Sequence, residues 1–163
     1  MSAVITATRS HTISCGHRVV GHESKCKDLH GHNYTITVTV EAKSLDKVGR
    51  VLDFGFMKSL FCQWLEDNWD HKFLMWRDDP LWDRQTVERW PGTIAVDFNP
   101  TAENMAEYLL RQFQGLLHIN TDCRDGKNVQ VVSVKVQETP KCSATAVLAP
   151  LVVEDTGYDT ASR

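Results

Sequence analysis

Hydrophobic and polar residues alternate in two segments near the N-terminus, and each alternation predicts a β-strand. The clearest is Asn33–Ala42, in which isoleucine and valine side chains would face one side and threonines the other. The segment Val4–Ser14 is rich in threonine, valine and isoleucine and predicts a first strand. We expect the two strands to form an antiparallel pair, joined by a long loop over residues 16–31.

Two later segments show the spacing of apolar residues that is typical of helices. In residues 52–68 an apolar stripe predicts a helix with its aromatic face in the core, and Asp53 is placed to cap its N-terminus. The stripe consists of Phe56, Leu60, Phe61 and Trp64. A second helix is expected over residues 99–117, capped by Asn99 or Thr101. Its buried face would comprise Met105, Leu109 and Phe113.

The remaining segments complete the expected order of elements. Met75–Pro100 is irregular and long enough to be a loop or lid, with at most a short helical turn. After a turn at Gly126, residues 128–139 predict a strand, and residues 143–153 predict a last one. The order strand, strand, helix, helix, strand, strand predicts an α+β domain with both helices on one face of an antiparallel sheet. The tail after Val153 is expected to be exposed.

Length and composition favour one domain over residues 1–163, with a core from about 4 to 153. The chain has 163 residues, 42% hydrophobic residues and a formal net charge of −3. No apolar run approaches the roughly 20 residues that cross a bilayer, and we expect no signal peptide, membrane partner or nucleic-acid partner. The five cysteines are odd in number and scattered, which favours free thiols in a reducing cytoplasm.

A His-Gly-His sequence is the first candidate for a metal site. His30 and His32 would project to one face of an extended segment, with Gly31 between them. His17, at the end of the first strand, is the leading third ligand. Three neutral imidazoles with an open position are a common catalytic zinc arrangement, although the same set fits other transition metals. The histidines that are less well placed are His11, His22 and His118.

Four further residues carry chemistry that the local pattern alone leaves open. Cys26 fits either a fourth metal ligand or a thiolate that acts as a base or nucleophile beside the metal. The adjacent Asp70 and His71 could relay a proton, or simply be a solvated pair at a helix end. Glu138 ends an apolar strand, where its carboxylate is either solvated or placed to accept hydrogen bonds from the N–C–N edge of a guanine-like ring.

Six motifs in order give the chain a resemblance to a known superfamily. They are SCGHRV, CKDLHGHNY, VLDFGFMK, WDHKFL, NPTAEN and VQET. With them the chain resembles the 6-pyruvoyltetrahydropterin synthase and 6-carboxytetrahydropterin synthase superfamily over about residues 4–153. The resemblance implies the tunnelling fold, or T-fold: two strands, two helices and two strands, three copies of which close a β-barrel. Trimers of this kind commonly pair into hexamers, with active sites between subunits.

The resemblance also implies roles for the candidate residues. His17, His30 and His32 would hold Zn²⁺. Cys26 would be the catalytic thiol, and Asp70 and His71 would complete a proton-transfer set with it, drawn from both sides of a subunit boundary. The pterin ring would be bound by Glu138 and Thr101.

The spacing within CKDLHGHNY indicates a branch of the superfamily. Only three residues separate Cys26 from His30, as in the 6-carboxytetrahydropterin synthases of queuosine biosynthesis. This implies a carbon–carbon lyase that converts 7,8-dihydroneopterin triphosphate to 6-carboxy-5,6,7,8-tetrahydropterin, acetaldehyde and triphosphate. The alternatives are a 6-pyruvoyltetrahydropterin synthase, a relative that cleaves sepiapterin-like side chains, and a non-catalytic zinc- or pterin-binding oligomer. The chain departs from the family pattern in SCGHRV, at Met75 and in the long segment Met75–Pro100.

Overall fold

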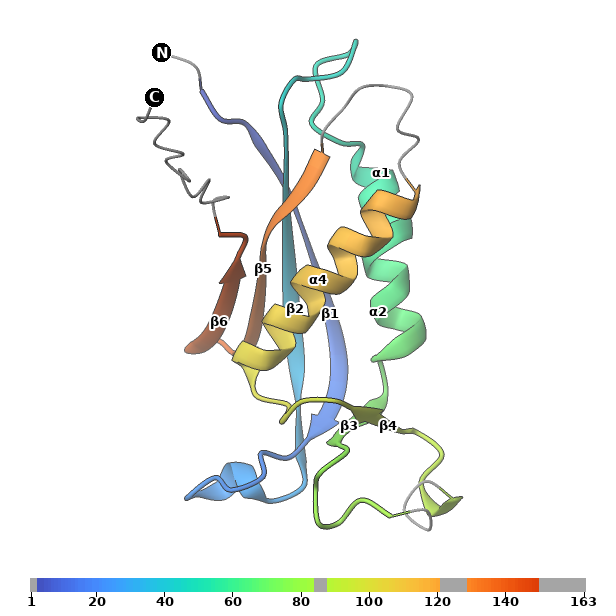
Figure 1. Ribbon diagram of the computed structural model, residues 1–163, viewed down its shortest axis with the longest axis vertical. Coiled ribbons are helices and arrows are strands. Elements are labelled where there is room, and N and C mark those ends of the chain that lie inside the picture. The colour runs from blue at the N-terminus through green and yellow to red at the C-terminus, as the bar shows by residue number, and fades with distance from the viewer. Residues whose placement is uncertain (1–2, 84–87, 121–128, 150–163) are drawn as a thin grey trace, which may run out of the picture.

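The computed structural model describes residues 3–83, 88–120 and 129–149 (Figure 1). Within these residues a six-stranded sheet has the strand order β4-β3-β1-β2-β5-β6. The strands are β1 (Thr6–His17), β2 (His30–Ala42), β3 (Lys72–Trp76), β4 (Thr93–Val96), β5 (Val129–Thr139) and β6 (Cys142–Val147). The expected turn at Gly126, the end of the last predicted strand and the tail lie outside the described residues.

Strands β1 and β2 form the long antiparallel pair that the alternation predicts, and β5 and β6 continue it in antiparallel order. The inward side chains Ile36, Val38 and Val40 of β2 are at most 2% exposed. On the opposite face, hydroxyl groups pair across the two strands, for example Ser10 with Thr37 at 2.8 Å. One face of the hairpin therefore supplies the core, and the other is polar.

The first predicted helix is confirmed as a continuous rod. It comprises α1 (Phe54–Met57), the wider π-helical segment η2 (Lys58–Cys62) and α2 (Gln63–Asn68). The Asp53 carboxylate accepts a hydrogen bond of 3.0 Å from the Phe56 N–H, so the predicted N-cap is present. Of the predicted stripe, Phe61 is fully buried and the others pack partly buried against the core.

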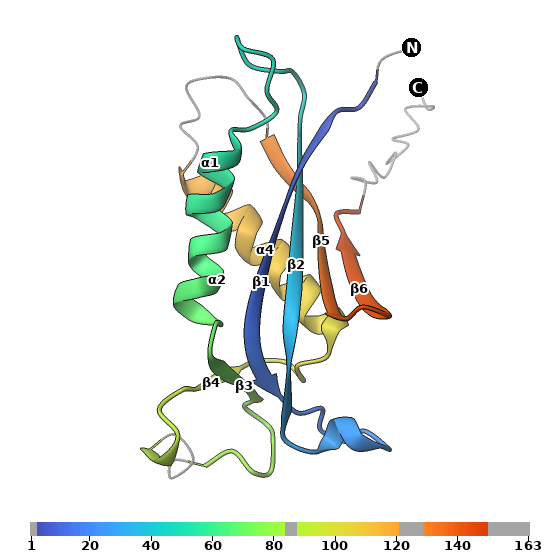
Figure 2. The same cartoon turned by 180° about the vertical axis from the view of Figure 1, so that it is seen from behind.

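Helix α4 (Ala102–Asn120) lies across the same face of the sheet, which the two opposite views in Figures 1 and 2 show. The predicted inward residues Met105, Leu109 and Phe113 all have 0% exposure. The Phe113 ring lies 5.0 Å from Phe61 and 5.8 Å from Trp64, measured between ring centroids. The helical layer and the sheet therefore enclose one apolar core, as an α+β domain requires.

Two short strands were missed by the sequence pattern. The region 75–100 was expected to be irregular, but β3 and β4 lie at its ends, where β1–β3 and β3–β4 pair in parallel. The four long strands are antiparallel as expected, so the complete sheet is mixed. Segments of four or five residues give too little alternation to predict a strand. The hairpin loop is also shorter than expected, because β1 continues to His17 and β2 begins at His30.

Several chain segments meet at one end of the sheet. There β1 ends, β2 and β3 begin, α4 starts and β5 finishes (Figure 1). The residues to which the resemblance assigns roles all lie at or next to these termini or in the loop between β1 and β2. Neither helix in the described residues is long and apolar enough to cross a bilayer.

Candidate metal centre

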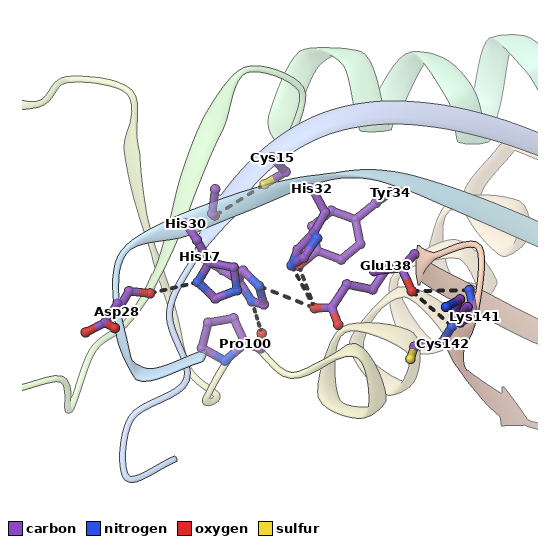
Figure 3. A network of polar contacts seen from close by, with 12 residues as sticks. Cys15, His17, Asp28, His30, His32, Tyr34, Pro100, Glu138, Lys141 and Cys142 are labelled. Atoms are coloured by element: carbon purple, nitrogen blue, oxygen red, sulfur yellow. Dashed lines mark hydrogen bonds and ion pairs between the residues drawn. The ribbon is translucent and has the colours of Figure 1, made fainter. Parts of the chain in front are cut away.

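Three histidines converge at this end of the sheet. One is the last residue of β1, and the other two are the first and third residues of β2. Strand pairing places His17 directly opposite His30, and the alternation of β2 puts His32 on the same face. One nitrogen of each ring lies within 4.8 Å of the others. Figure 3 shows the three rings facing one another. The arrangement brings together the three residues that the sequence singled out.

Backbone carbonyls fix the orientation of two of these rings. His17 Nδ1 lies 2.6 Å from the carbonyl oxygen of Pro100, and His30 Nδ1 lies 2.7 Å from that of Asp28. A carbonyl oxygen can only accept, so each Nδ1 carries a proton, and in the neutral ring it is Nε2 that presents the lone pair. In metal sites, histidine ligands are commonly oriented in this way, by a hydrogen bond from the ring nitrogen that does not bind the metal.

The cluster also has electrostatic features that suit a metal ion. Burial is the largest cause that lowers the pKa of His17 and of His32, and the neighbouring imidazoles lower both pKa values further. Both rings are therefore neutral at neutral pH, as ligands must be. The Nε2 atoms of His17 and His32 are buried without a hydrogen-bond partner among the described residues. Unpaired buried lone pairs are costly, and a bound cation would satisfy them.

These residues fit a divalent transition metal with nitrogen ligands. Three neutral imidazoles leave a fourth position open for water or substrate, which is the arrangement of catalytic zinc sites. Imidazole binds copper, nickel and iron as well, so the donor set alone does not select zinc. The three histidines together could therefore hold one metal ion.

Glu138 reaches the cluster from β5. Its Oε1 lies 3.4 Å from the Nε2 atoms of both His17 and His32, and it accepts a hydrogen bond of 3.3 Å from the Tyr34 hydroxyl (Figure 3). Burial, followed by the negative charge of Glu138, raises the pKa of Tyr34, so the phenol remains a donor. With 22% of its side chain exposed, the carboxylate closes one side of the histidine cluster. The sequence predicted a strand-end acid but not this contact with the imidazoles.

Cys26 lies in a short 3₁₀ turn, η1 (Lys25–Lys27), within the β1–β2 loop. The backbone N–H of Val19 donates a hydrogen bond of 2.7 Å to the Cys26 carbonyl, which holds the turn against the chain leaving β1. The thiol is half-buried and free. Cys26 is not among the residues that converge as metal ligands in the described chain.

Asp70 and His71 form a pair that is anchored to the edge of β1. Asp70 accepts hydrogen bonds from the Ser14 N–H at 2.8 Å and from His71 Nδ1 at 2.7 Å. Burial opposes ionisation of Asp70, but these bonds and the His71 charge outweigh it and hold the pKa below its usual value. His71 has a left-handed backbone with φ of 55°, and its side chain is 81% exposed. A non-glycine residue in this region is a strained feature that often marks a functional site.

The Asp70–His71 pair and Cys26 do not meet within the described part of one chain. No hydrogen bond or ion pair between described residues joins the Cys26 thiol to Asp70 or His71. Two cavities, of about 680 and 460 Å³, lie where His71 and His30 both line the walls. The exposed imidazole of His71 is therefore available to a ligand or to a second copy of the chain.

Thr101 serves as the N-cap of α4. Its hydroxyl accepts a hydrogen bond of 3.2 Å from the Asn104 N–H, which confirms one of the two predicted caps.

Asn99 instead has a role that the sequence did not suggest. Its amide accepts from the Val20 N–H and donates to the Val20 carbonyl, both at 2.9 Å. With the carbonyl of Pro100 bonded to His17, this segment fixes the chain on both sides of the β1 terminus. This role depends on a contact between the Asn99 side chain and a backbone segment far away in the sequence, so sequence spacing does not reveal it.

The other candidate histidines lie away from the cluster. His11 Nε2 is 2.6 Å from the Glu66 carboxylate, His22 Nδ1 accepts from the Ser24 N–H, and His118 is exposed in the last turn of α4. Cys15 is buried beside the cluster, and burial raises the pKa of its thiol to about 12. It therefore remains protonated and is not a nucleophile at neutral pH.

Comparisons with known proteins point to one family. A family model described as 6-pyruvoyl tetrahydropterin synthase matches residues 6–148. A protein of Rickettsia felis named 6-carboxy-5,6,7,8-tetrahydropterin synthase is 36% identical over 85% of this chain and 97% of its own length. A Halobacterium salinarum protein named as a probable enzyme of the same kind is 35% identical over 81% of this chain and 79% of its own.

Solved structures confirm the fold. An uncharacterized protein of Wolinella succinogenes has a TM-score of 0.75 at 24% identity, over 90% of this chain and 99% of its own. The 6-pyruvoyl tetrahydropterin synthase of Caenorhabditis elegans has a TM-score of 0.61 at 22% identity, over 90% of this chain and 97% of its own. At these identities the likeness shows the T-fold architecture alone.

Proposed function

The chain belongs to the 6-pyruvoyl tetrahydropterin synthase family, and on that basis we propose that it is a zinc-dependent 6-carboxytetrahydropterin synthase. It is an enzyme of the lyase class. The proposed reaction converts 7,8-dihydroneopterin triphosphate and water to 6-carboxy-5,6,7,8-tetrahydropterin, acetaldehyde and triphosphate. Water supplies the second carboxyl oxygen. The observation that carries the proposal is the convergence of three histidines, two of them with unpaired buried Nε2 atoms, beside Glu138.

We infer that His17, His30 and His32 hold Zn²⁺ through their Nε2 atoms. The bonds from His17 to the Pro100 carbonyl and from His30 to the Asp28 carbonyl support this, because they turn the Nε2 lone pairs inward. Zinc bound there would supply Lewis-acid polarisation of the side-chain oxygens of the substrate.

Cys26, as the thiolate, removes a proton from a carbon of the substrate side chain. His71 moves a second proton between side-chain positions, and the Asp70 carboxylate orients its ring through the 2.7 Å bond to Nδ1. Because no described contact joins these residues to Cys26 within one chain, we infer that a second copy contributes Asp70 and His71. The 81% exposure of the His71 side chain supports a site shared between subunits of a trimer or a pair of trimers.

Glu138 binds the pterin ring in this scheme. Its carboxylate is a charged acceptor beside the histidines, and two N–H groups on one edge of the ring would donate to its two oxygens. The ring edge would then fix the distance between the substrate side chain and the cluster. Thr101, whose hydroxyl caps α4, would contribute to pterin binding from the start of that helix.

The proposal also assigns the chain to the branch of the family that cleaves a carbon–carbon bond. The three-residue spacing between Cys26 and His30 and the names of the curated relatives both support carbon–carbon cleavage. The product would then supply a route to 7-deazaguanine compounds such as queuosine.

Product identification tests the reaction directly. The zinc-loaded protein is incubated with 7,8-dihydroneopterin triphosphate, the pterin is identified by mass spectrometry and acetaldehyde is trapped. We expect 6-carboxytetrahydropterin with equimolar acetaldehyde. A product consisting only of 6-pyruvoyltetrahydropterin would assign the chain to the triphosphate-eliminating branch. Tight pterin binding without turnover would instead favour a non-catalytic binding protein.

A further inference from the structure

The proposed substrate carries a triphosphate, yet the protein has a formal net charge of −3. A triphosphate must therefore meet positive charge that is concentrated locally, since the overall field of the protein repels it. From the placement of cationic side chains around the cavities we propose that Lys72 binds the triphosphate group. This inference rests on the proposed function and identifies the part of the chain that would recognise the anionic end of the substrate.

Arg18, which directly follows the ligand His17, is not available for this task. Its Nε lies 3.2 Å from the Asp79 carboxylate, and the side chain of Asp79 is completely buried. Removing one partner would leave an uncompensated buried charge, which is strongly unfavourable. The other oxygen of Asp79 accepts a hydrogen bond from the Leu81 N–H. Arg18 therefore neutralises Asp79 and holds the segment after β3.

Lys25 and Lys27 flank Cys26 but line neither cavity beside the site. Both side chains are exposed on the 3₁₀ turn, where water screens their charge. Of the described residues, Lys72 and Arg89 are the only lysine or arginine residues that line these two cavities. Arg89 lines the larger cavity but not the smaller one. Lys72 is thus the cationic residue shared by both cavities.

The position of Lys72 suits a phosphate-binding group. Lys72 begins β3, directly after His71, and the two cavities share only Gly16, His30, His71 and Lys72 among the described residues. Its backbone is fixed, because its N–H donates to the Trp69 carbonyl at 3.2 Å and its carbonyl accepts from the Cys15 thiol at 3.3 Å. It forms no ion pair with any acidic residue in the described part of the chain. Lys72 is half-buried as a residue, and an unpaired ammonium group next to the exposed His71 is a strong partner for a polyphosphate.

Two opposed positions beside the cavities have no space for a side chain and require glycine. Gly16 and Gly31 lie opposite each other on β1 and β2. A Cβ at Gly16 would come within 2.4 Å of the Phe73 ring, and one at Gly31 within 2.9 Å of the Cys15 carbonyl. Without a Cβ at either position, Phe73 and the backbone of β1 can pack closely there, and Gly16 lines both cavities together with Lys72 and His71.

Binding of inorganic triphosphate tests the inference without requiring turnover. The zinc-loaded full chain is titrated with triphosphate by isothermal calorimetry at low and moderate salt, and zinc content is measured afterwards to exclude chelation. We expect Lys72→Gln to weaken binding by about tenfold or more, the range for a charge-assisted hydrogen bond. Lys72→Arg should retain most of the affinity. The matched control Lys58→Gln removes an exposed lysine from the helical rod and should bind as the wild type does.

Separate arms distinguish this inference from the proposed reaction. Dihydroneopterin, which lacks phosphate, should bind the wild type and Lys72→Gln equally. The inference is overturned if the wild type does not bind triphosphate, if Lys72→Gln binds it unchanged, or if Lys25→Gln or Lys27→Gln is needed to lose binding. Loss of both ligands in Lys72→Gln and in Lys72→Arg would assign Lys72 a structural role and also overturn it. Triphosphate binding that depends on Lys72, without turnover of the phosphorylated pterin, would contradict the proposed reaction alone.

Discussion

The inward row of β2 differs between its two ends, although backbone and pairing are continuous. At one end Ile36, Val38 and Val40 fill the core, and at the other His32 and His30 continue the same alternation. On β5 the buried valines Val134 and Val136 lead in the same way to Glu138. The same strand geometry thus creates either a core or a site, and the side chains decide which. Stability should depend on the first region and function on the second.

Removing one imidazole should cause the largest effect, and it should be confined to the site end. His17→Ala should reduce metal affinity by about a thousandfold or more, because a buried ligand is lost from a set of three. Catalysis should fall to background. Zinc content after dialysis and turnover of the phosphorylated pterin measure these effects. The apo protein should unfold at a temperature close to that of the wild type, and a collapse of apo stability would show that the two ends are not separable.

A core substitution should have the opposite profile. Phe113 is fully buried between the helices and contacts Phe61 and Trp64. Phe113→Ala should lower the free energy of unfolding by about 3–5 kcal/mol, as large-to-small aromatic changes do. Urea denaturation measures this, with metal affinity determined on the folded fraction. Retained stability would contradict the assignment of Phe113 to the core. A large loss of metal affinity in the folded fraction would contradict the claim that stability and metal binding depend on different ends of the sheet.

Asn99 joins the two regions through the backbone of Val20, so its substitution should have an intermediate effect. Asn99→Ala removes both amide bonds to Val20 and loosens the chain that follows His17. We expect zinc affinity to fall by about 10- to 100-fold, the usual range for a supporting contact. Competition with a chelator measures it. As a control, Asn120→Ala removes a single amide–carbonyl bond at the far end of α4 and should leave zinc affinity unchanged.

The smallest expected effect is on the pH dependence of the stability of the metal-free protein, to which the histidines of the site contribute. The lowered pKa values of His17 and His32 mean that the unfolded chain binds more protons than the folded chain below about pH 6.5. Stability is therefore full above that pH and decreases as the pH falls, by at most about 1.4 kcal/mol per unit for each histidine. His17→Gln should reduce this slope between about pH 6.5 and 5, and the exposed His118→Gln should not. Equal slopes in all three proteins would contradict the assigned cause.

The core could be predicted from the sequence more fully than the site. Alternation and helical spacing predicted the four long strands, both helices, the Asp53 cap and the inward face of α4, because each depends on neighbours in the chain. The short strands β3 and β4 were missed, since parallel pairing to β1 is a long-range effect. The convergence of the three histidines followed from strand pairing. The contacts of Glu138 with two imidazoles and of Asn99 with Val20 could not be predicted, because they join residues separated by about a hundred positions.

The central claim is that the imidazoles bind the metal while the thiol does chemistry beside it. The most direct test is Cys26→Ala, with zinc stoichiometry determined by elemental analysis and turnover measured on the same sample. We expect one zinc ion per chain, as in the wild type, and no conversion of 7,8-dihydroneopterin triphosphate. Loss of zinc would make Cys26 a fourth ligand of a structural site, and retained turnover would remove the thiol from catalysis. Either result would contradict the account.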